Sequence, residues 1–244
     1  MIPRHLYEKF HQKTTFQEKL INVKNFTYRI ILGVINSHIS SFSNKTILDI
    51  GCGAGTISLY LANQGANIIG IDISRKAIDS CKKSAKALKL KDRTQFICNT
   101  IEQIKFRRKF DLIICSEIIE HIPNDKAFLK RVYKLLKNNG LLILSTPSIN
   151  APLYKIGLAQ NFDKQVGHIR RYSKKQISDL VKKSGFTIEK VKLTEGVLRN
   201  FFFLTRFGWF IKFFRGIISD IVTVIDNFLI RPLGESQIFI VARK

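Results

Sequence analysis

Residues 47–55 read ILDIGCGAG, and this stretch decides the fold class of the chain. Its first half is apolar at almost every position, which is typical of a strand buried on both faces of a parallel sheet. Its second half alternates glycines, which allow the backbone to approach a ligand closely. Residues 56–66 have a helical pattern, and a helix N-terminus presents N–H groups to a ligand. A strand, a glycine turn and a helix form half of a nucleotide-binding βαβ unit.

Length and charge bound the class of protein. The chain has 244 residues, of which 45% are hydrophobic and 24% charged, as expected for one globular α/β domain. Its formal net charge of +23 favours an anionic partner, either a nucleic acid or the surface of an anionic membrane. The alternative is that the lysines serve solubility alone.

The cysteines and the N-terminal residues bear on location. The four cysteines lack CxxC spacing and are predicted to be buried free thiols in a reducing compartment: Cys52, Cys81, Cys98 and Cys115. Residues 1–20 are too polar for a signal peptide, and no apolar run reaches the length of a membrane span. We expect a cytoplasmic protein, with a peripheral position at the inner membrane surface as an open alternative.

Strands and helices are predicted to alternate along the chain. Strands are expected at 47–50, 68–71, 95–98, 110–115, 141–145, 186–193 and 237–242, and helices within 16–39 and at 56–66, 74–88, 123–137 and 174–184. In the helix at 123–137, Pro123 is the expected start and Asn138-Asn139-Gly140 the expected end. This alternation predicts an α/β fold with a doubly wound parallel sheet, whose ligands lie outside the carboxyl ends of the strands.

Two segments depart from this regularity. Residues 148–173 are expected to form a long loop, and loops of that length are usually functional. Residues 199–233 begin with crowded aromatic and basic side chains, and from Asp220 they predict an amphipathic surface helix. Its apolar face would comprise Ile221, Val224, Ile225 and Phe228. The segment either covers the sheet or contacts a membrane or a lipid substrate.

Two acids accompany the glycine turn. Asp72 ends the second predicted strand, where its carboxylate can accept both hydroxyls of a ribose. Asp49 precedes the glycines and would lie near a bound ammonium group or an ordered water, which suits a nucleoside that carries an amino acid. The alternative is a tight connection between strand and helix that binds nothing.

A second polar motif, ExxEH, follows the strand at 110–115. Its residues Glu117, Glu120 and His121 would share one face of a helical turn, because positions i, i+3 and i+4 are neighbours there. Such oxygen and nitrogen ligands suit Mg, Mn, Fe or Zn. Without a metal, His121 or His168 would be the general base. The alternative is that the acids only cap and solvate a surface turn while His168 packs in its loop.

Four motifs in order, ILDIGCGAG, IIGIDIS, FDLIICSEIIEHI and LLKNNGLLILSTP, resemble the class I S-adenosylmethionine-dependent methyltransferases. The resemblance covers residues 45–147 and continues more weakly through GHIRRYSKKQISDLVKKSGF. It implies a Rossmann-like, seven-stranded sheet whose last strand, 237–242, is antiparallel, and a helical insertion before it. One methyltransferase domain would then span 1–244, with an N-terminal cap at 1–44, the cofactor-binding core at 45–147, a substrate segment at 148–198, the insertion at 199–233 and the last strand within 234–244.

The resemblance also implies which residues bind the cofactor. The glycine turn would contact the methionine part, Asp49 its amino group and Asp72 the ribose. Asn99 stands where the family usually has an aspartate that faces the adenine, and an amide can still form a hydrogen bond there without a charge. Arg29 would match, loosely, an arginine near the cofactor carboxylate. The complete implied set is Arg29, Asp49, Gly51, Cys52, Gly53, Gly55, Asp72, Ile73, Asn99, Thr100 and Ser116.

The ExxEH motif is similar to that of two methyltransferase types, the ubiquinone-pathway O-methyltransferases and the small-RNA 2'-O-methyltransferases. In both, a later histidine completes a divalent metal site. Here that histidine would be His168, so the implied ligands for a metal such as Mg are Glu117, Glu120, His121 and His168.

Three functions follow as hypotheses. The first is O-methylation of a lipophilic small molecule, such as a quinone precursor or a lipid-linked phenol or sugar. The second is RNA 2'-O-methylation, which the charge favours, although the aromatics are not spaced as a stacking platform for bases. The third is a noncatalytic assembly or membrane-interaction factor, and the intact glycine turn with Asp72 argues against it.

Overall fold

A mixed β-sheet forms the centre of the computed structural model, which describes residues 8, 16–23, 25–204 and 217–244. Within these residues the sheet has seven strands in the order β3-β2-β1-β4-β5-β7-β6. The strands β1 to β5 are parallel, and β7 is antiparallel to both of its neighbours. The predicted fold class, including the antiparallel last strand, is confirmed. The strands are β1 (Thr46–Ile50), β2 (Asn67–Asp72), β3 (Thr94–Cys98), β4 (Phe110–Ser116), β5 (Leu136–Pro147), β6 (Thr187–Thr194) and β7 (Gln237–Arg243).

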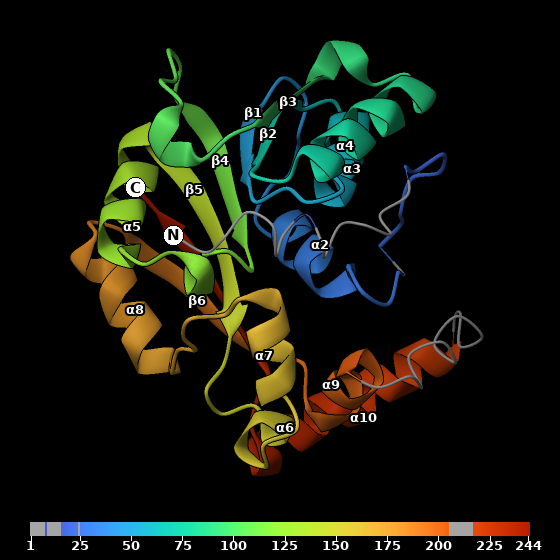
Figure 1. The fold of residues 1–244 in the computed structure, drawn as a ribbon, viewed down its shortest axis with the longest axis vertical. Coiled ribbons are helices and arrows are strands. Elements are labelled where there is room, and N and C mark those ends of the chain that lie inside the picture. Colours follow the sequence, from blue (N-terminus) through green and yellow to red (C-terminus); the bar gives the residue numbers. More distant parts are fainter. Residues whose placement is uncertain (1–7, 9–15, 24, 205–216) are drawn as a thin grey trace.

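Helices cover both faces of the sheet. One face carries α2 (Arg29–Asn36), α3 (Thr56–Asn63) and α4 (Arg75–Ala87), and the other carries α5 (Asp125–Leu135) and α8 (Lys174–Lys183), as Figure 1 shows. Neighbouring strand residues point to opposite faces, so that Ile47 packs with the first group and Leu48 with the second. This explains why strand 47–50 is apolar throughout.

Local sequence signals place most helix ends correctly. The side chain of Ser74 accepts a hydrogen bond from the N–H of Ala77 and caps α4, at the start of the predicted helix 74–88. The prediction for 123–137 is wrong at both ends. Asn124, not Pro123, caps α5, since its side chain accepts from the N–H of Ala127. At the other end, Leu136 already pairs with Phe110 of β4. The predicted helix end, Asn138-Asn139-Gly140, therefore belongs to the first part of β5.

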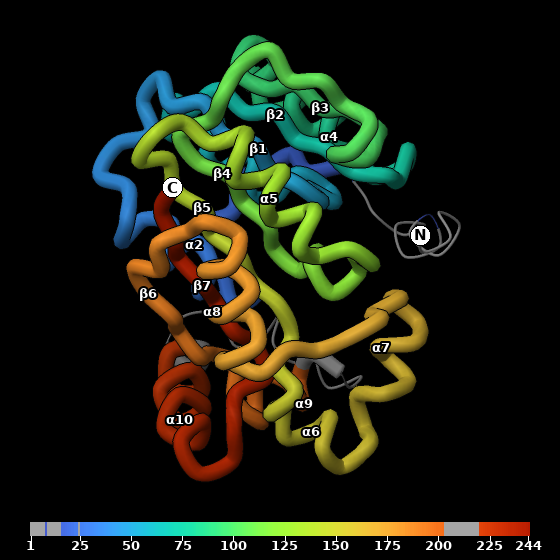
Figure 2. Tube along the Cα trace, turned by 90° about the vertical axis from the view of Figure 1, so that its left-hand side faces the viewer, coloured from blue at the N-terminus to red at the C-terminus, as the bar shows by residue number. Residues whose placement is uncertain are grey.

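The segment 148–173 was predicted to be one long loop, and this prediction is wrong. The segment contains two short helices, α6 (Pro152–Lys155) and α7 (Gln160–Val166). The predicted insertion contains α9 (Val197–Leu204) and α10 (Ile217–Leu233), which lie between β6 and β7 in the chain. The helix α6 packs against α9, and α9 packs against α10. Both views place this group at one end of the molecule (Figures 1 and 2).

The apolar side of α10 does not cover the sheet. Between 47% and 78% of each of its apolar stripe residues is exposed: Ile221, Val224, Ile225 and Phe228. Among the described residues, no helix is long and apolar enough to cross a membrane. The four cysteines are free thiols, as predicted, and all but Cys98 are buried.

Candidate active site

The glycine turn connects β1 to α3 and depends on glycine at each alternate position. Gly51, Gly53 and Gly55 have positive φ angles of 72°, 51° and 75°. A Cβ on Gly51 would lie 2.9 Å from the Cδ1 atom of Ile118, and a Cβ on Gly55 would lie 2.8 Å from the Sγ atom of Cys81. Backbone conformation therefore disfavours a larger residue at all three positions, and lack of space also excludes one at Gly51 and Gly55. The turn is positioned at the end of β1 because the N–H of Gly51 donates to the carbonyl of Ile71 in β2.

Asp72 lies at the end of β2 and holds the glycine turn in place. One carboxylate oxygen accepts from the N–H of Gly53 at 2.9 Å, and the other accepts from the N–H of Ser74 at 2.8 Å. A carboxylate offers about four lone-pair sites, so these two bonds leave capacity for the hydroxyls of a ribose.

Asp49 is buried one residue before the end of β1. Its carboxylate accepts a hydrogen bond of 2.6 Å from the Ser58 hydroxyl of α3. Burial raises its pKa to about 6, an effect that the Ser58 hydrogen bond opposes and the nearby charge of Asp72 reinforces. A cation bound beside Asp49 would relieve this cost of burying a charge.

The other predicted cofactor residues lie at the carboxyl ends of the neighbouring strands. The N–H of Asn99, just after β3, donates to the carbonyl of Asp72, and the Asn99 side chain accepts from the N–H of Thr100. The thiol of Cys98 donates to the carbonyl of Ile73. Ser116 ends β4, where its hydroxyl lies 3.1 Å from the Ser145 hydroxyl.

Arg29 lies on α2 and connects this helix to α10. Its guanidinium forms an ion pair with Asp220 and donates a hydrogen bond of 3.3 Å to Thr223. These described contacts do not bring Arg29 to the glycine turn, so they give no support to its predicted role beside the cofactor.

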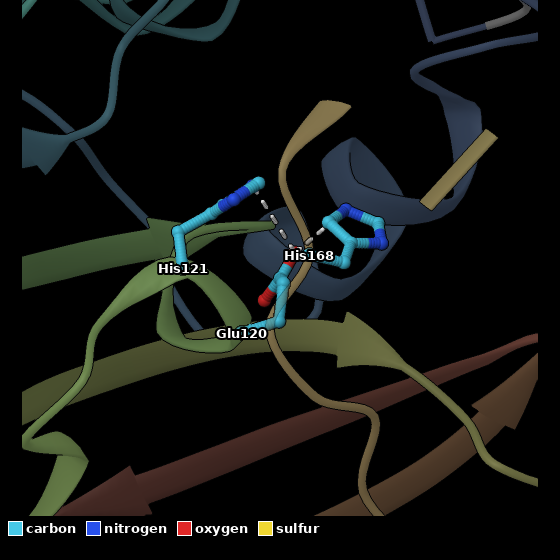
Figure 3. A group of neighbouring side chains, drawn as sticks. All are labelled: Glu120, His121 and His168. Atoms are coloured by element: carbon cyan, nitrogen blue, oxygen red, sulfur yellow. Dashed lines mark ion pairs between the residues drawn. The ribbon is translucent and has the colours of Figure 1, made fainter. Parts of the chain in front are cut away.

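The ExxEH segment and His168 meet just beyond β4. The Oε1 atom of Glu120 lies 3.8 Å from the Nε2 atom of His168 and 4.0 Å from the Nε2 atom of His121 (Figure 3). One ligand atom from each residue lies within 4.8 Å of the others, which is a spacing that a metal ion can bridge. The structure therefore brings together three of the four predicted metal ligands.

Both imidazoles are held with the same nitrogen toward Glu120. The Nδ1 atom of His121 lies 3.0 Å from the carbonyl oxygen of Gly167, which can only accept, so Nδ1 carries the proton. Burial, with a smaller contribution from the neighbouring His168, lowers the pKa of His121 to about 4, so the ring is neutral at pH 7. The Nε2 atom that faces Glu120 is then a lone-pair donor.

A carboxylate fixes the second histidine. The Nδ1 atom of His168 lies 2.8 Å from Asp163, and Arg171 binds both oxygens of Asp163 at 2.7 Å. A carboxylate behind an imidazole sets the tautomer and orients the opposite nitrogen, as is common at metal ligands. Asp163 and Arg171 were not predicted, because a single acid and a single arginine in an irregular segment carry no spacing signal.

Glu120 itself is fully buried. One oxygen accepts from the Thr146 hydroxyl at 3.1 Å, while the buried Oε1 atom has no hydrogen-bond partner among the described residues. Burial raises the pKa of Glu120 well above its ordinary value, and the charge of Glu117 adds to this shift. A buried acceptor opposite two imidazole nitrogens is unfavourable unless a proton or a cation lies between them.

Glu117 does not share a helical face with Glu120, so that prediction is wrong. The backbone of Glu117 has a φ of 52°, and the short 3₁₀ turn η4 (Ile119–His121) begins only after it. The Glu117 carboxylate accepts instead from the Ser145 hydroxyl at 2.8 Å. Glu117 is therefore outside the group formed by Glu120, His121 and His168.

A family model described as a methyltransferase domain matches residues 41–193. The chain therefore belongs to this methyltransferase domain family. It is similar to a ubiquinone biosynthesis O-methyltransferase of Rickettsia canadensis, with 35% identity over 128 residues that cover 52% of this chain and 53% of the relative. A relative of the same description from Pelagibacter ubique is 39% identical over 112 residues, which cover 46% of each chain. This chain thus spans about half the length of the curated relatives that it matches.

Solved structures share the fold across nearly the whole chain. The magnesium protoporphyrin IX methyltransferase of Synechocystis PCC 6803, with bound SAH, has a TM-score of 0.65 at 16% identity and covers 99% of this chain and 97% of its own. The [4+2]-cyclase SpnF has a TM-score of 0.66 at 15% identity, with coverage of 98% and 92%. A methyltransferase and a cyclase therefore share this fold, which by itself does not define the reaction.

Proposed function

We propose that this protein transfers the methyl group of S-adenosylmethionine to an oxygen of a lipophilic small molecule, such as a quinone precursor or a lipid-linked phenol or sugar. The observation that carries this proposal is the contact between the two sites. Ile118, inside the ExxEH motif, lies so close to Gly51 that it excludes a side chain there. The polar cluster therefore adjoins the turn that would hold the methyl donor. The relatives described as ubiquinone biosynthesis O-methyltransferases support the choice of oxygen as the acceptor.

In the proposed cofactor site, each residue of the turn has a separate task. The glycines admit the methionine part, Asp49 faces its ammonium group and Asp72 accepts from the ribose. Asn99, Thr100 and Ser116 would surround the adenine end, beside Ile73. Because Asp49 is already buried with a raised pKa, a bound ammonium would favour its ionised form.

The donor set of the second site fits a divalent metal such as Mg, Mn or Zn, with Glu120, His121 and His168 as its ligands. The fit rests on the buried Oε1 atom of Glu120, which has no hydrogen-bond partner among the described residues. A bound divalent metal would lower the pKa of an acceptor hydroxyl. Thr146, Gly167 and Asp163 hold the three side chains in place for this role.

During the transfer, the acceptor oxygen bonds to the methyl carbon as the carbon–sulfur bond breaks, and the hydroxyl proton must leave. If no metal binds, His168 is the better proton acceptor of the two histidines. Asp163 stabilises the imidazolium that would form on His168, whereas burial disfavours a charged His121.

The lipophilic acceptor also implies contact with a membrane, and we propose that residues 199–233 provide a peripheral contact of this kind. RNA 2'-O-methylation is the second candidate, because a net charge of +23 attracts nucleic acid as well as anionic lipid. A noncatalytic role stays third, and the intact glycine turn with Asp72 argues against it.

Incubation with S-adenosylmethionine labelled on its methyl group tests these candidates together. A cell extract that contains lipids, RNA and proteins is treated with the protein, and the three fractions are separated. We expect label in the lipid fraction, in an alkali-stable ether. Label in RNA alone would support the second candidate, and no transfer to any fraction would favour the third.

A further inference from the structure

The helix α10 presents its polar side to the protein. Asp226 is fully buried in the middle of this helix and caps the start of α9, where it accepts from the N–H groups of Gly196, Leu198 and Arg199 at 2.7–3.2 Å. Asp220 and Thr223 on the same side bind Arg29 of α2. The helix is therefore held by a carboxylate cap and by a contact with an arginine, in addition to its half-buried apolar residues Val222, Leu229 and Ile230.

The opposite side of α10 carries an exposed apolar stripe, defined here as Ile221, Val224, Ile225 and Phe228. Their exposed fractions are 51%, 68%, 47% and 78%. The spacing i, i+3, i+4, i+7 places them in one row along the helix. Single exposed apolar residues are common, but a continuous row of this length marks an interaction surface.

Neighbouring elements extend the apolar character of this end of the molecule. Ile156 and Leu158, in the turn between α6 and α7, are 67% and 65% exposed. They follow α6, which packs against α9, and α9 in turn packs against α10. Figures 1 and 2 show these helices together at the end of the molecule opposite α3 and α4.

We infer that the apolar stripe of α10 docks on the surface of an anionic lipid bilayer, with the helix axis along the membrane plane. This inference rests on the proposed lipophilic acceptor and adds the surface through which the protein would reach it. A stripe of this kind inserts into the boundary between headgroups and acyl chains, and attraction between basic protein and anionic lipid strengthens the binding.

The charges of α10 and of the whole chain favour a bilayer over a second copy. The two acids of the helix do not face outward as unpaired charges, since Asp226 is buried and Asp220 is bound to Arg29. Arg231 is exposed near the end of the helix. Two copies that each carry a net charge of +23 repel one another, whereas an anionic bilayer attracts the chain.

Vesicle co-sedimentation with matched variants tests this inference. The full chain is mixed with vesicles of phosphatidylcholine alone or with added phosphatidylglycerol, at low and high salt. The test variant is Val224→Gln with Phe228→Gln, which keeps a good helix former at each position. The control is Asn227→Gln, at an exposed polar position of the same helix. Circular dichroism and calorimetric binding of S-adenosylmethionine are measured for every protein.

We expect the wild type and the control to bind the phosphatidylglycerol vesicles, less strongly at high salt. The partition coefficient of the test variant on these vesicles should be roughly tenfold or more lower, because two apolar side chains that would be buried in the bilayer are replaced by polar ones. Unchanged partitioning of the test variant, or no binding by the wild type, would overturn the inference. So would a dimer in sedimentation velocity that only the test variant disrupts. If the wild type does not bind S-adenosylmethionine in calorimetry, the proposed function is contradicted instead. The failure of the inference and the failure of the proposed function can therefore be told apart.

Discussion

At the scale of single residues, Asp49 combines burial, a close hydrogen bond and a place beside the proposed methyl donor. Its raised pKa means that the folded protein keeps a proton which the unfolded chain releases as pH rises from about 3.8 toward about 6. The unfolded state then binds fewer protons than the folded state, so this group lowers the free energy of unfolding across that window and above it. The loss should be recovered when the charge is removed or when a cation binds.

We therefore predict that Asp49→Asn raises the free energy of unfolding of the ligand-free protein at pH 7 by about 1–3 kcal/mol, with no gain near pH 4. The same variant should bind S-adenosylmethionine more weakly. Urea denaturation at several pH values and calorimetry measure the two effects. Asp111→Asn is the control, because it should lower the free energy of unfolding at pH 7. Burial raises the pKa of Asp111, but hydrogen bonds from Lys137 and Thr46 outweigh burial and lower the pKa overall. A destabilised Asp49→Asn at pH 7 would contradict this account.

The buried Oε1 atom of Glu120 leads to a second residue-scale prediction. Addition of a divalent metal should raise the Tm of the wild type, by an amount that corresponds to about 2.7 kcal/mol when the metal is at 100 times its Kd. Glu120→Gln keeps the shape of the side chain but removes its charge, so it should lose most of this stabilisation. Glu117→Gln, outside the ligand group, should keep it. Equal shifts for wild type and Glu120→Gln would exclude Glu120 as a ligand.

Sequence patterns predicted the local geometry of the glycine turn better than that of the second site. Gly51, Gly53 and Asp72 follow from a local rule, because a strand end, a tight turn and a strand-end acid are all visible in short stretches. Asp163 on α7 binds His168 and Arg171, which follow it in the next loop, and no helix or strand period encodes these separations of five and eight positions. Glu117 was misplaced because a helical period was assumed across a residue with positive φ.

At the scale of elements, the buried Asp226 of α10 caps α9 and joins these two helices. The buried carboxylate of Asp226 satisfies three backbone N–H groups at a helix N-terminus, which is also where a negative charge is favourable. An amphipathic pattern alone could not predict this, because it tells which residues share a face and not which face is buried.

Asp226→Ala should lower the free energy of unfolding by about 1–3 kcal/mol, since it leaves buried N–H groups without an acceptor. Asn227→Ala, at the next and exposed position, should change it by less than about 0.5 kcal/mol. Chemical denaturation measures both, and hydrogen exchange should show faster exchange at the start of α9 in the first variant only. Equal stability of the two variants would show that the cap does not hold α9.

At the scale of the whole molecule, the seven-stranded sheet and its antiparallel last strand were implied by the family resemblance that the four motifs carry. The sheet was predictable because parallel strands buried on both faces are apolar throughout. The structure of the segments proposed to surround the methyl acceptor was not predictable in the same way. Segments 148–173 and 199–233 are held by contacts between distant residues, such as Arg29 with Asp220 and Ser148 with Glu235. Each of these pairs joins residues more than 80 positions apart, beyond the reach of local patterns.

Calorimetric titration of S-adenosylmethionine into the wild type and into Asp72→Ala tests the central claim most directly. We predict one binding site per chain in the wild type and a loss of roughly tenfold or more in affinity for the variant. The lost carboxylate holds the N–H of Gly53 and, in the proposed site, would accept from the ribose. Circular dichroism confirms that the variant is folded. Absence of binding by the wild type, or equal affinity in a folded Asp72→Ala, would contradict the account.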